Sequence, residues 1–173
     1  MNKKLFIGVI LLVVILIGVI FGVASTNNDS KEISTKSLSA EQIVNKLKEN
    51  NSNIGKIVVY NEETDLNKLL SRPNQYISKV TFEDKRIEQI ELDEDFSTEE
   101  ERNEPTGGTV EVFKNKADME SRKRYIEQIS GGSSMFAQYI YSSNYALLRL
   151  DSDLTPSQAK EYEEAFYKIM ENN

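Results

Sequence analysis

The chain has 173 residues, with 28 acidic and 21 basic side chains and a net charge of −7 at neutral pH. It contains no cysteine, histidine or tryptophan. An acidic chain is a poor match for nucleic acid, whose binding requires clustered lysine and arginine. Without cysteine and histidine, thiol catalysis and tight zinc or copper sites are excluded. We therefore predict no nucleic-acid partner and no cofactor.

An uninterrupted apolar segment, Leu5–Ala24, contains no charged residue. At a helical rise of about 1.5 Å per residue, such a segment spans roughly 30 Å, the thickness of the hydrocarbon core of a bilayer. Lys3 and Lys4 precede the segment, and no basic residue follows it until Lys31. By the positive-inside rule, residues 1–4 stay in the cytoplasm and the rest of the chain is exported. We predict a single-pass protein of the cell membrane with an extracytoplasmic C-terminal domain.

Two features of the apolar segment leave alternatives open. The segment would be a cleaved secretory signal if Gly22-Val23-Ala24 were a cleavage site, although the apolar core of a signal is usually only about 7–15 residues long. A lipoprotein signal would need cysteine where Ser25 stands. Gly18 and Gly22 form a GxxxG pattern, which lets a second helix approach closely and form a homodimer. The alternative is that glycine is simply common in membrane helices.

The remaining chain divides into a linker and one domain. Residues 25–38 are polar and lack periodicity, which predicts a flexible linker with a span of roughly 20 Å. Residues 39–173 are enough for one domain with a single core. Because the linker keeps this domain close to the bilayer, we expect a protein of the cell envelope as its partner.

Capping signals and periodicity predict the first elements of the domain. Ser39 and Gln42 form a capping box, so a helix is expected from Ser39 to about Glu49. β-Branched residues predict a strand at 54–60, which we expect to be central in the sheet. Period-two alternation predicts a second strand at 76–82, and a shorter third strand is expected at 87–92.

The sequence of the second half of the domain predicts two further helices and three strands. Gly107-Gly108 leads into a strand at 109–113, and Asn115 caps a helix that ends at Gly131. A hairpin is expected from strands at 136–141 and 145–150. Thr155 and Gln158 start a final helix that runs to about Met170. This order predicts an α+β fold, with an antiparallel-rich sheet and helices packed on one face.

Carboxylates offer the main candidates for chemistry. The stretch 92–105 is strongly acidic and predicts an exposed loop, with calcium binding as the alternative, but the Asp-x-Asp-x-Asp-Gly spacing is missing. Glu83 and Asp84 form a carboxylate pair of the kind that glycosidases use, or else a solvated turn. The chain has no Gly-x-Ser-x-Gly motif and no phosphate-binding loop. We predict that the protein is not an enzyme and has no catalytic or metal-binding residues.

Three blocks of sequence carry a resemblance. They are Gly55-Lys56-Ile57-Val58-Val59-Tyr60 with residues 63–76, then Gly107-Gly108-Thr109-Val110-Glu111-Val112-Phe113, and then Leu147-Leu148-Arg149-Leu150 with Leu154-Thr155-Pro156. Together they resemble a family of small surface proteins and lipoproteins of Gram-positive bacteria that has no established activity. The resemblance covers residues 39–170 and implies an anchored surface domain without assigned catalytic residues. Members are often anchored by a lipid on cysteine, and this chain departs from them by its apolar segment.

A polar loop between the first two predicted strands is the candidate recognition surface. Arg72 can form two parallel hydrogen bonds to a carboxylate of a partner. The alternative is a structural loop, in which Asp65 caps the following turn and Arg72 ties the loop down. The candidate partner-binding residues are Glu63, Asp65, Arg72, Asn74 and Tyr76.

These observations favour one function and leave two alternatives. The leading hypothesis is a non-enzymatic, membrane-anchored extracytoplasmic binding module that acts near the outer face of the bacterial membrane. The first alternative is a prophage-type superinfection exclusion protein that blocks the passage of phage DNA through the membrane. The second alternative is a carboxylate-dependent cell-wall hydrolase.

Overall fold

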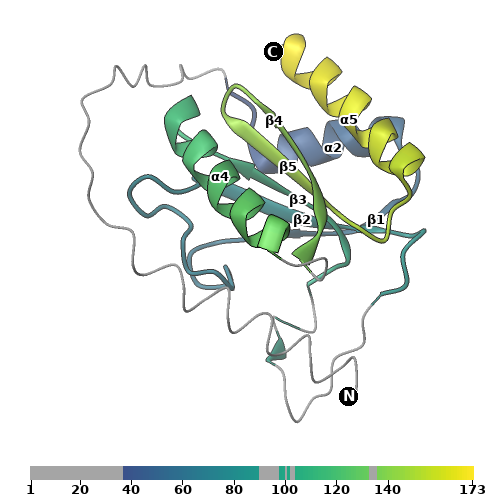
Figure 1. Cartoon of the computed structure of the whole chain (residues 1–173), viewed down its shortest axis with the longest axis horizontal. Helices are drawn as coiled ribbons and strands as arrows, with labels where there is room; N and C mark the ends of the chain where they lie inside the picture. The colour runs from purple at the N-terminus through teal and green to yellow at the C-terminus, as the bar shows by residue number, and fades with distance from the viewer. Residues whose placement is uncertain (1–36, 90–97, 100, 102–103, 133–135) are drawn as a thin grey trace.

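The computed structural model describes residues 37–89, 98–99, 101, 104–132 and 136–173. The predicted segment Leu5–Ala24 and most of the linker lie outside these ranges. The fold is α+β, as predicted, and its elements surround one sheet (Figure 1). In chain order the elements are α2 (Ala40–Asn50), β1 (Ile54–Val59), β2 (Ser78–Asp84), β3 (Gly107–Val112), α4 (Lys116–Gly132), β4 (Gln138–Ser143), β5 (Ala146–Asp151) and α5 (Pro156–Glu171).

The sheet has five strands in the order β1-β2-β3-β5-β4, and every neighbouring pair is antiparallel. The predicted antiparallel sheet is therefore confirmed. The expectation that the 54–60 strand is central is wrong, because β1 lies at the edge and Val59 is 50% exposed. Residues Ile87–Gln89 form no strand, and the rest of the predicted 87–92 strand lies outside the described ranges.

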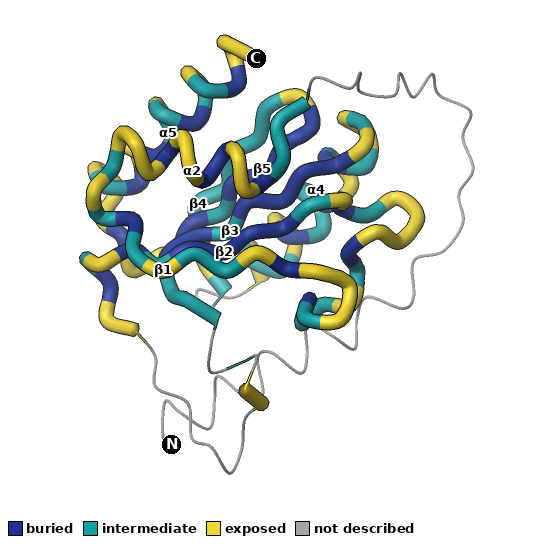
Figure 2. Tube along the Cα trace, turned by 180° about the vertical axis from the view of Figure 1, so that it is seen from behind, coloured by how far each residue is buried: buried dark blue, intermediate teal, exposed yellow. Residues whose placement is uncertain are grey.

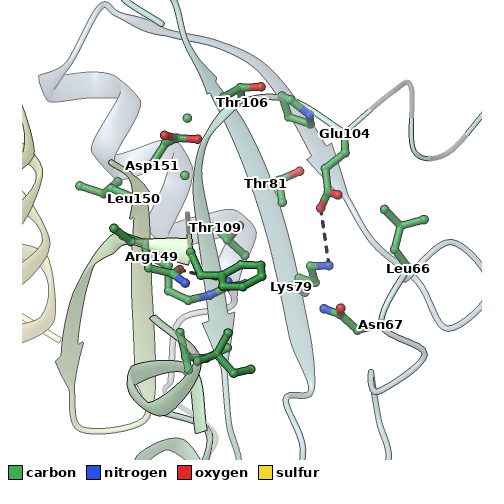
Figure 3. Close-up of a pocket in the computed structure, with 18 of the residues that line it drawn as sticks. Leu66, Asn67, Lys79, Thr81, Glu104, Thr106, Thr109, Arg149, Leu150 and Asp151 are labelled. Atoms are coloured by element: carbon green, nitrogen blue, oxygen red, sulfur yellow. Dashed lines mark hydrogen bonds and ion pairs between the residues drawn. The ribbon is translucent and has the colours of Figure 1, made fainter. Parts of the chain in front are cut away.

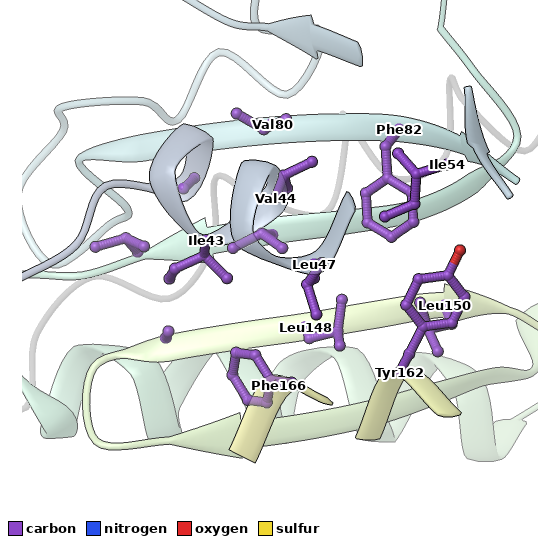
Figure 4. Packing of buried hydrophobic residues seen from close by; sticks show 14 of the residues in the cluster. Ile43, Val44, Leu47, Ile54, Val80, Phe82, Leu148, Leu150, Tyr162 and Phe166 are labelled. Atoms are coloured by element: carbon purple, nitrogen blue, oxygen red, sulfur yellow. The ribbon is translucent and has the colours of Figure 1, made fainter. Parts of the chain in front are cut away.

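The main core lies between one face of the sheet and the helices α2 and α5 (Figure 4). Alternate strand positions such as Val80, Phe82 and Leu148 point to this face, because successive side chains of a strand point to opposite sides. The helices contribute apolar residues at helical spacing, which the sequence predicts for both. These buried helix residues are Ala40, Ile43, Val44 and Leu47 of α2 and Ala159, Tyr162, Phe166 and Met170 of α5.

Helix α4 packs on the opposite face, so the prediction that all helices cover one face is wrong. Figure 1 shows α4 and α2 on different sides of the sheet, and both faces of the central strands are buried (Figure 2). Met119 of α4 belongs to a second, smaller core with Phe113 and Leu147. The neighbouring Leu148 belongs to the main core. The apolar stripe of a helix shows which side of the helix is buried and does not show which face of a sheet it covers.

Capping boxes start α2 and α5 where the sequence predicts them. In α2, the Ser39 hydroxyl accepts a hydrogen bond from the Gln42 backbone amide at 3.2 Å, and the Gln42 side chain accepts one from the Ser39 backbone amide at 2.9 Å. Thr155 and Gln158 repeat this arrangement at the start of α5. The reciprocal bonds satisfy two amides that the first helical turn leaves unpaired.

The close packing at Gly108 gives a testable prediction. A Cβ atom at this position would overlap the Phe82 ring and press on Leu150. Because both neighbours are held in the main core, Gly108→Ala is expected to lower the free energy of unfolding by about 1–3 kcal/mol. Chemical denaturation followed by circular dichroism measures this change. Gly131→Ala is the control, since a Cβ there meets open space, and an equal loss in both variants would contradict the prediction.

Candidate functional site

Charged side chains lie in the middle of three neighbouring strands on the α4 face of the sheet. They are Lys79 on β2, Glu111 on β3 and Arg149 on β5. Lys79 is in register with Glu111, and Arg149 is in register with Thr109. Residues paired in this way point to the same face, so the three charges share one polar layer. Lys79 and Glu111 are almost completely buried in it.

Glu111 is the centre of the larger ion-pair network. Its carboxylate accepts two hydrogen bonds from Arg122 of α4, both at 3.1 Å, and one from Arg149 Nη2 at 3.2 Å. Burial opposes ionisation of Glu111, but the two guanidinium groups outweigh it and lower its pKa to about 2. This network holds α4 to the sheet through β3 and β5.

Asp65 is the centre of a second network, which fastens the loop 60–77 to β2. It accepts a hydrogen bond from Lys79 Nζ at 3.0 Å and one from the Tyr76 hydroxyl at 2.7 Å. The backbone amides of Leu69 and Leu70 also donate to it, at 2.9 and 3.0 Å. Burial opposes ionisation of Asp65, yet the charge of Lys79 and the Tyr76 hydrogen bond lower its pKa. Asp65 is therefore an ionised, fully enclosed anchor of the loop.

A pocket of about 370 Å³ opens on this polar layer beside α4 (Figure 3). Strands β2, β3, β4 and β5 supply polar lining residues, and α4 supplies Ile126 and Ile129 together with Arg122. The segment 104–106 and residues Leu66 and Asn67 line other parts of it. Ligand sites commonly combine apolar walls with a few placed polar groups in this way. The polar lining residues on the strands are Lys79, Thr81, Thr109, Gln138, Arg149 and Asp151.

The cations around the pocket are enclosed and already paired, whereas its carboxylates are more open. The side chains of Lys79, Arg122 and Arg149 are 2%, 5% and 17% exposed, and each forms an ion pair with Asp65 or Glu111. The Glu104 side chain is 28% exposed and lies 3.9 Å from Lys79 (Figure 3). Arg122 and Arg149 share one carboxylate, but together with Glu101, Glu104 and Asp151 the described carboxylates outnumber the cations, so the pocket carries a net negative charge.

Asp151 and Glu101 line the pocket and form no ion pair with a described cation, and of the two Asp151 lies on the sheet. Its Oδ1 accepts a hydrogen bond from the Asp153 backbone amide at 2.9 Å, and it forms no ion pair within the part of the chain that the structure describes. Burial raises its pKa, and the neighbouring Asp153 charge adds to the shift. A partly buried carboxylate in this position is stabilised by any positive group that enters the pocket.

The five residues predicted to bind a partner separate into two groups. Asp65 and Tyr76 are fully buried and hydrogen-bonded to each other, which supports the structural alternative for them. Glu63, Arg72 and Asn74 are exposed on the loop 60–77, and Asn74 has a positive φ of 62°. Among the described residues the Arg72 side chain makes no hydrogen bond or ion pair, so it does not tie the loop down there. A partner-binding role for the exposed three stays a prediction.

The other candidate carboxylates do not converge. Asp84 is fully buried and accepts hydrogen bonds from Tyr162 at 2.7 Å and from Arg86, whereas Glu83 accepts one from the Lys56 backbone amide at 2.8 Å. As adjacent strand residues they point to opposite faces and cannot act on one bond. Much of the acidic stretch 92–105 lies outside the described ranges, and the described residues hold no group of three acidic side chains suited to a metal ion.

Gly18 and Gly22, the predicted dimer face, lie outside the residues that the structure describes. None of the described helices is long and apolar enough to cross a membrane. The assignment of Leu5–Ala24 as the membrane anchor stays a prediction from the sequence.

The pocket was not predicted from the sequence, although the sequence contains a signal for its charged residues. Lys79 alternates with buried residues in β2, Glu111 stands between Val110 and Val112, and Arg149 interrupts a run of leucines. A charge inside an apolar strand must be paired when both faces of the sheet are covered. Three such strands therefore indicate a buried charge layer, but only their order in the sheet shows which charges meet.

Comparison with known proteins adds no assignment to this geometry. No family model, curated protein or solved structure matches the chain. The resemblance to small anchored surface proteins of Gram-positive bacteria therefore stays a prediction, and the argument for function depends on the pocket and on the predicted anchor.

Proposed function

We propose that the protein is a membrane-anchored, extracytoplasmic binding module without enzymatic activity, and that the pocket beside α4 is its binding site. The pocket carries this proposal, because it combines a rigid sheet, apolar residues of α4 and a charge layer in which each cation already has an acidic partner. Such an arrangement is suited to holding a ligand group in a pre-formed site.

The predicted anchor and linker support an envelope protein as the partner. A linker spanning roughly 20 Å keeps the domain near the outer face of the membrane, which places membrane proteins within its reach more readily than distant wall layers. Anchoring also raises the effective concentration of the module toward such partners. The proposal therefore places the domain outside the cell, on a single membrane-spanning helix with a cytoplasmic N-terminus.

Site-specific photo-crosslinking of the full chain in intact Gram-positive cells tests this function. A photoreactive residue in place of Asn67, at the pocket, is expected to capture a discrete envelope protein. The same residue in place of Glu164, which is exposed on α5, is the matched control and is expected to capture none. Equal capture from both positions would overturn the pocket as the binding site.

Two further measurements test the rest of the proposal. Protease added to intact cells is expected to digest the C-terminal domain, and full protection would contradict the exported orientation. Capture of a membrane component that conducts phage DNA, with reduced plating of phage, would favour superinfection exclusion. Release of wall fragments by the purified full chain would show enzymatic activity and so contradict the proposal of a non-enzymatic module.

A further inference from the structure

We infer that the pocket beside α4 receives the basic side chain of a partner protein, with Asp151 as the counter-ion and Glu104 as a second carboxylate. This inference rests on the proposed function and names the chemistry of its ligand. It goes beyond a general binding role because the charges of the pocket favour a cationic ligand over an anionic one.

The cations and the carboxylates of the pocket differ in how far they are free to bind a ligand. Lys79 is neutralised by Asp65 at 3.0 Å, and Arg122 and Arg149 share Glu111. An anionic ligand would have to compete with these enclosed carboxylates for cations that are 2–17% exposed, and Arg149 Nε, which has no hydrogen-bond partner among the described residues, is itself buried. A cationic ligand meets Asp151, which has no cation among the described residues, and Glu104, whose only described cation lies 3.9 Å away.

The volume and the lining of the pocket also restrict the shape of the ligand. A volume of about 370 Å³ accommodates a long side chain and leaves room for water. Leu66, Ile126 and Ile129 offer contact to a methylene stem, while Thr106 and Gln138 offer oxygens for hydrogen bonds. Lysine and arginine have this combination of an apolar stem and a charged head. The described carboxylates do not converge as metal ligands do, which favours an organic cation over a metal ion.

Binding of short probes to the detergent-solubilised full chain tests the inference. The probe is Nα-acetyl-lysine methylamide, and its uncharged match is the same compound acetylated on Nε. Calorimetry or ligand-observed NMR is expected to show saturable binding of the charged probe only. Asp151→Asn is expected to weaken this binding roughly 10-fold or more, because it removes a charge-assisted contact.

Asp153→Asn is the matched control variant. It makes the same change of charge two residues away, at an exposed position outside the lining of the pocket, and its backbone hydrogen bond to Asp151 is retained. Binding of the lysine probe to this variant is expected to be unchanged. An equal loss of binding in both variants would show that only the general negative charge matters, and would overturn the role of Asp151.

The stability of Asp151→Asn separates binding from folding. The pKa of Asp151 is raised, so this residue favours the folded state below its unfolded pKa and that contribution is lost as the pH rises through the folded pKa. At neutral pH the ionised carboxylate therefore opposes folding. We expect Asp151→Asn to unfold at an equal or higher denaturant concentration than the wild type, and a clear loss of stability would contradict a purely ligand-binding role.

Other outcomes distinguish this inference from the function on which it rests. Tighter binding of Nα-acetyl-glutamate methylamide than of the lysine probe would overturn the inference and leave a binding pocket. Capture at Asn67 in cells without binding of the lysine probe would do the same. Binding of putrescine in preference to the lysine probe would replace a protein side chain by a free amine and so overturn the choice of partner. Absence of both capture and probe binding would overturn the inference and the proposed function together.

Discussion

Replacing Glu111 with glutamine is expected to lower the free energy of unfolding by about 3–5 kcal/mol. The carboxylate is fully buried and accepts hydrogen bonds from Arg122 and Arg149. Glutamine has nearly the same shape but no charge, so two enclosed guanidinium groups would lose their counter-ion. Breaking a buried pair in this way is costly because the remaining charge is desolvated without compensation.

Equilibrium unfolding of the full chain in urea, followed by circular dichroism, measures this loss. Glu120→Gln is the control, because Glu120 pairs with Lys116 on the exposed surface of α4, the helix that carries Arg122. Exposed pairs of this kind contribute about 0–1 kcal/mol. A loss below about 1 kcal/mol for Glu111→Gln would show that water or side-chain movement compensates the two arginines.

The pH dependence of the same variant provides an independent check. The pKa of Glu111 is lowered from 4.5 to about 2, so its ionised form stabilises the fold above the unfolded pKa. This contribution, on the order of 3 kcal/mol, is lost as the pH falls toward 2. The difference in unfolding free energy between wild type and Glu111→Gln is therefore expected to be largest above about pH 5. A difference that stays constant down to pH 2 would contradict this explanation.

Replacing Asp65 with asparagine is expected to cost about 3 kcal/mol and to release the loop 60–77 from the sheet. Among the described residues Lys79 would then keep only Glu104, at 3.9 Å, as an ion-pair partner. The hydrogen bonds from Tyr76 and from two loop amides would also lose a charged acceptor. Both effects act on the same carboxylate, so its loss affects the loop and the polar layer together.

Hydrogen exchange and urea unfolding test this prediction on the full chain. The amides of Leu69 and Leu70 are expected to exchange faster in Asp65→Asn, because Asp65 accepts their hydrogen bonds. Glu63→Gln, at an exposed position of the same loop, is expected to change neither exchange nor stability. Unchanged exchange in Asp65→Asn would mean that the loop is held by its apolar residues alone.

For the exposed residues of the loop 60–77 we expect little change in the free energy of unfolding. Arg72→Ala combined with Asn74→Ala is expected to lower the unfolding free energy by no more than about 1 kcal/mol, and this loss comes from position 74, where alanine tolerates the positive φ of 62° less well than asparagine does. If capture of the envelope partner were lost in this folded variant, the loop would be part of the recognition surface. If capture were unchanged, the loop would be excluded from it.

The sequence by itself determined where the helices start and located all five strands, although it also predicted a strand at 87–92 whose described residues, Ile87–Gln89, form none. The caps at Ser39, Asn115 and Thr155 could be predicted because a capping side chain bonds amides only two or three residues away. The apolar stripes of α2 and α5 could be predicted because helical spacing is a local property. The Leu5–Ala24 segment is likewise a local signal, since its length and lack of charge need no tertiary contact.

Apart from the predicted β4–β5 hairpin, only the tertiary structure decided which elements are neighbours. The strand 54–59 lies at the edge of the sheet, and α4 covers the face opposite to α2 and α5. Both placements depend on the path that the chain takes between strands, which residue types alone do not specify. The candidate site has the same origin. Lys79, Glu111 and Arg149 are far apart in sequence, and each is an isolated charge in a strand until the order β2-β3-β5 brings them into one layer. Long-range pairing therefore decides which buried charges compensate one another.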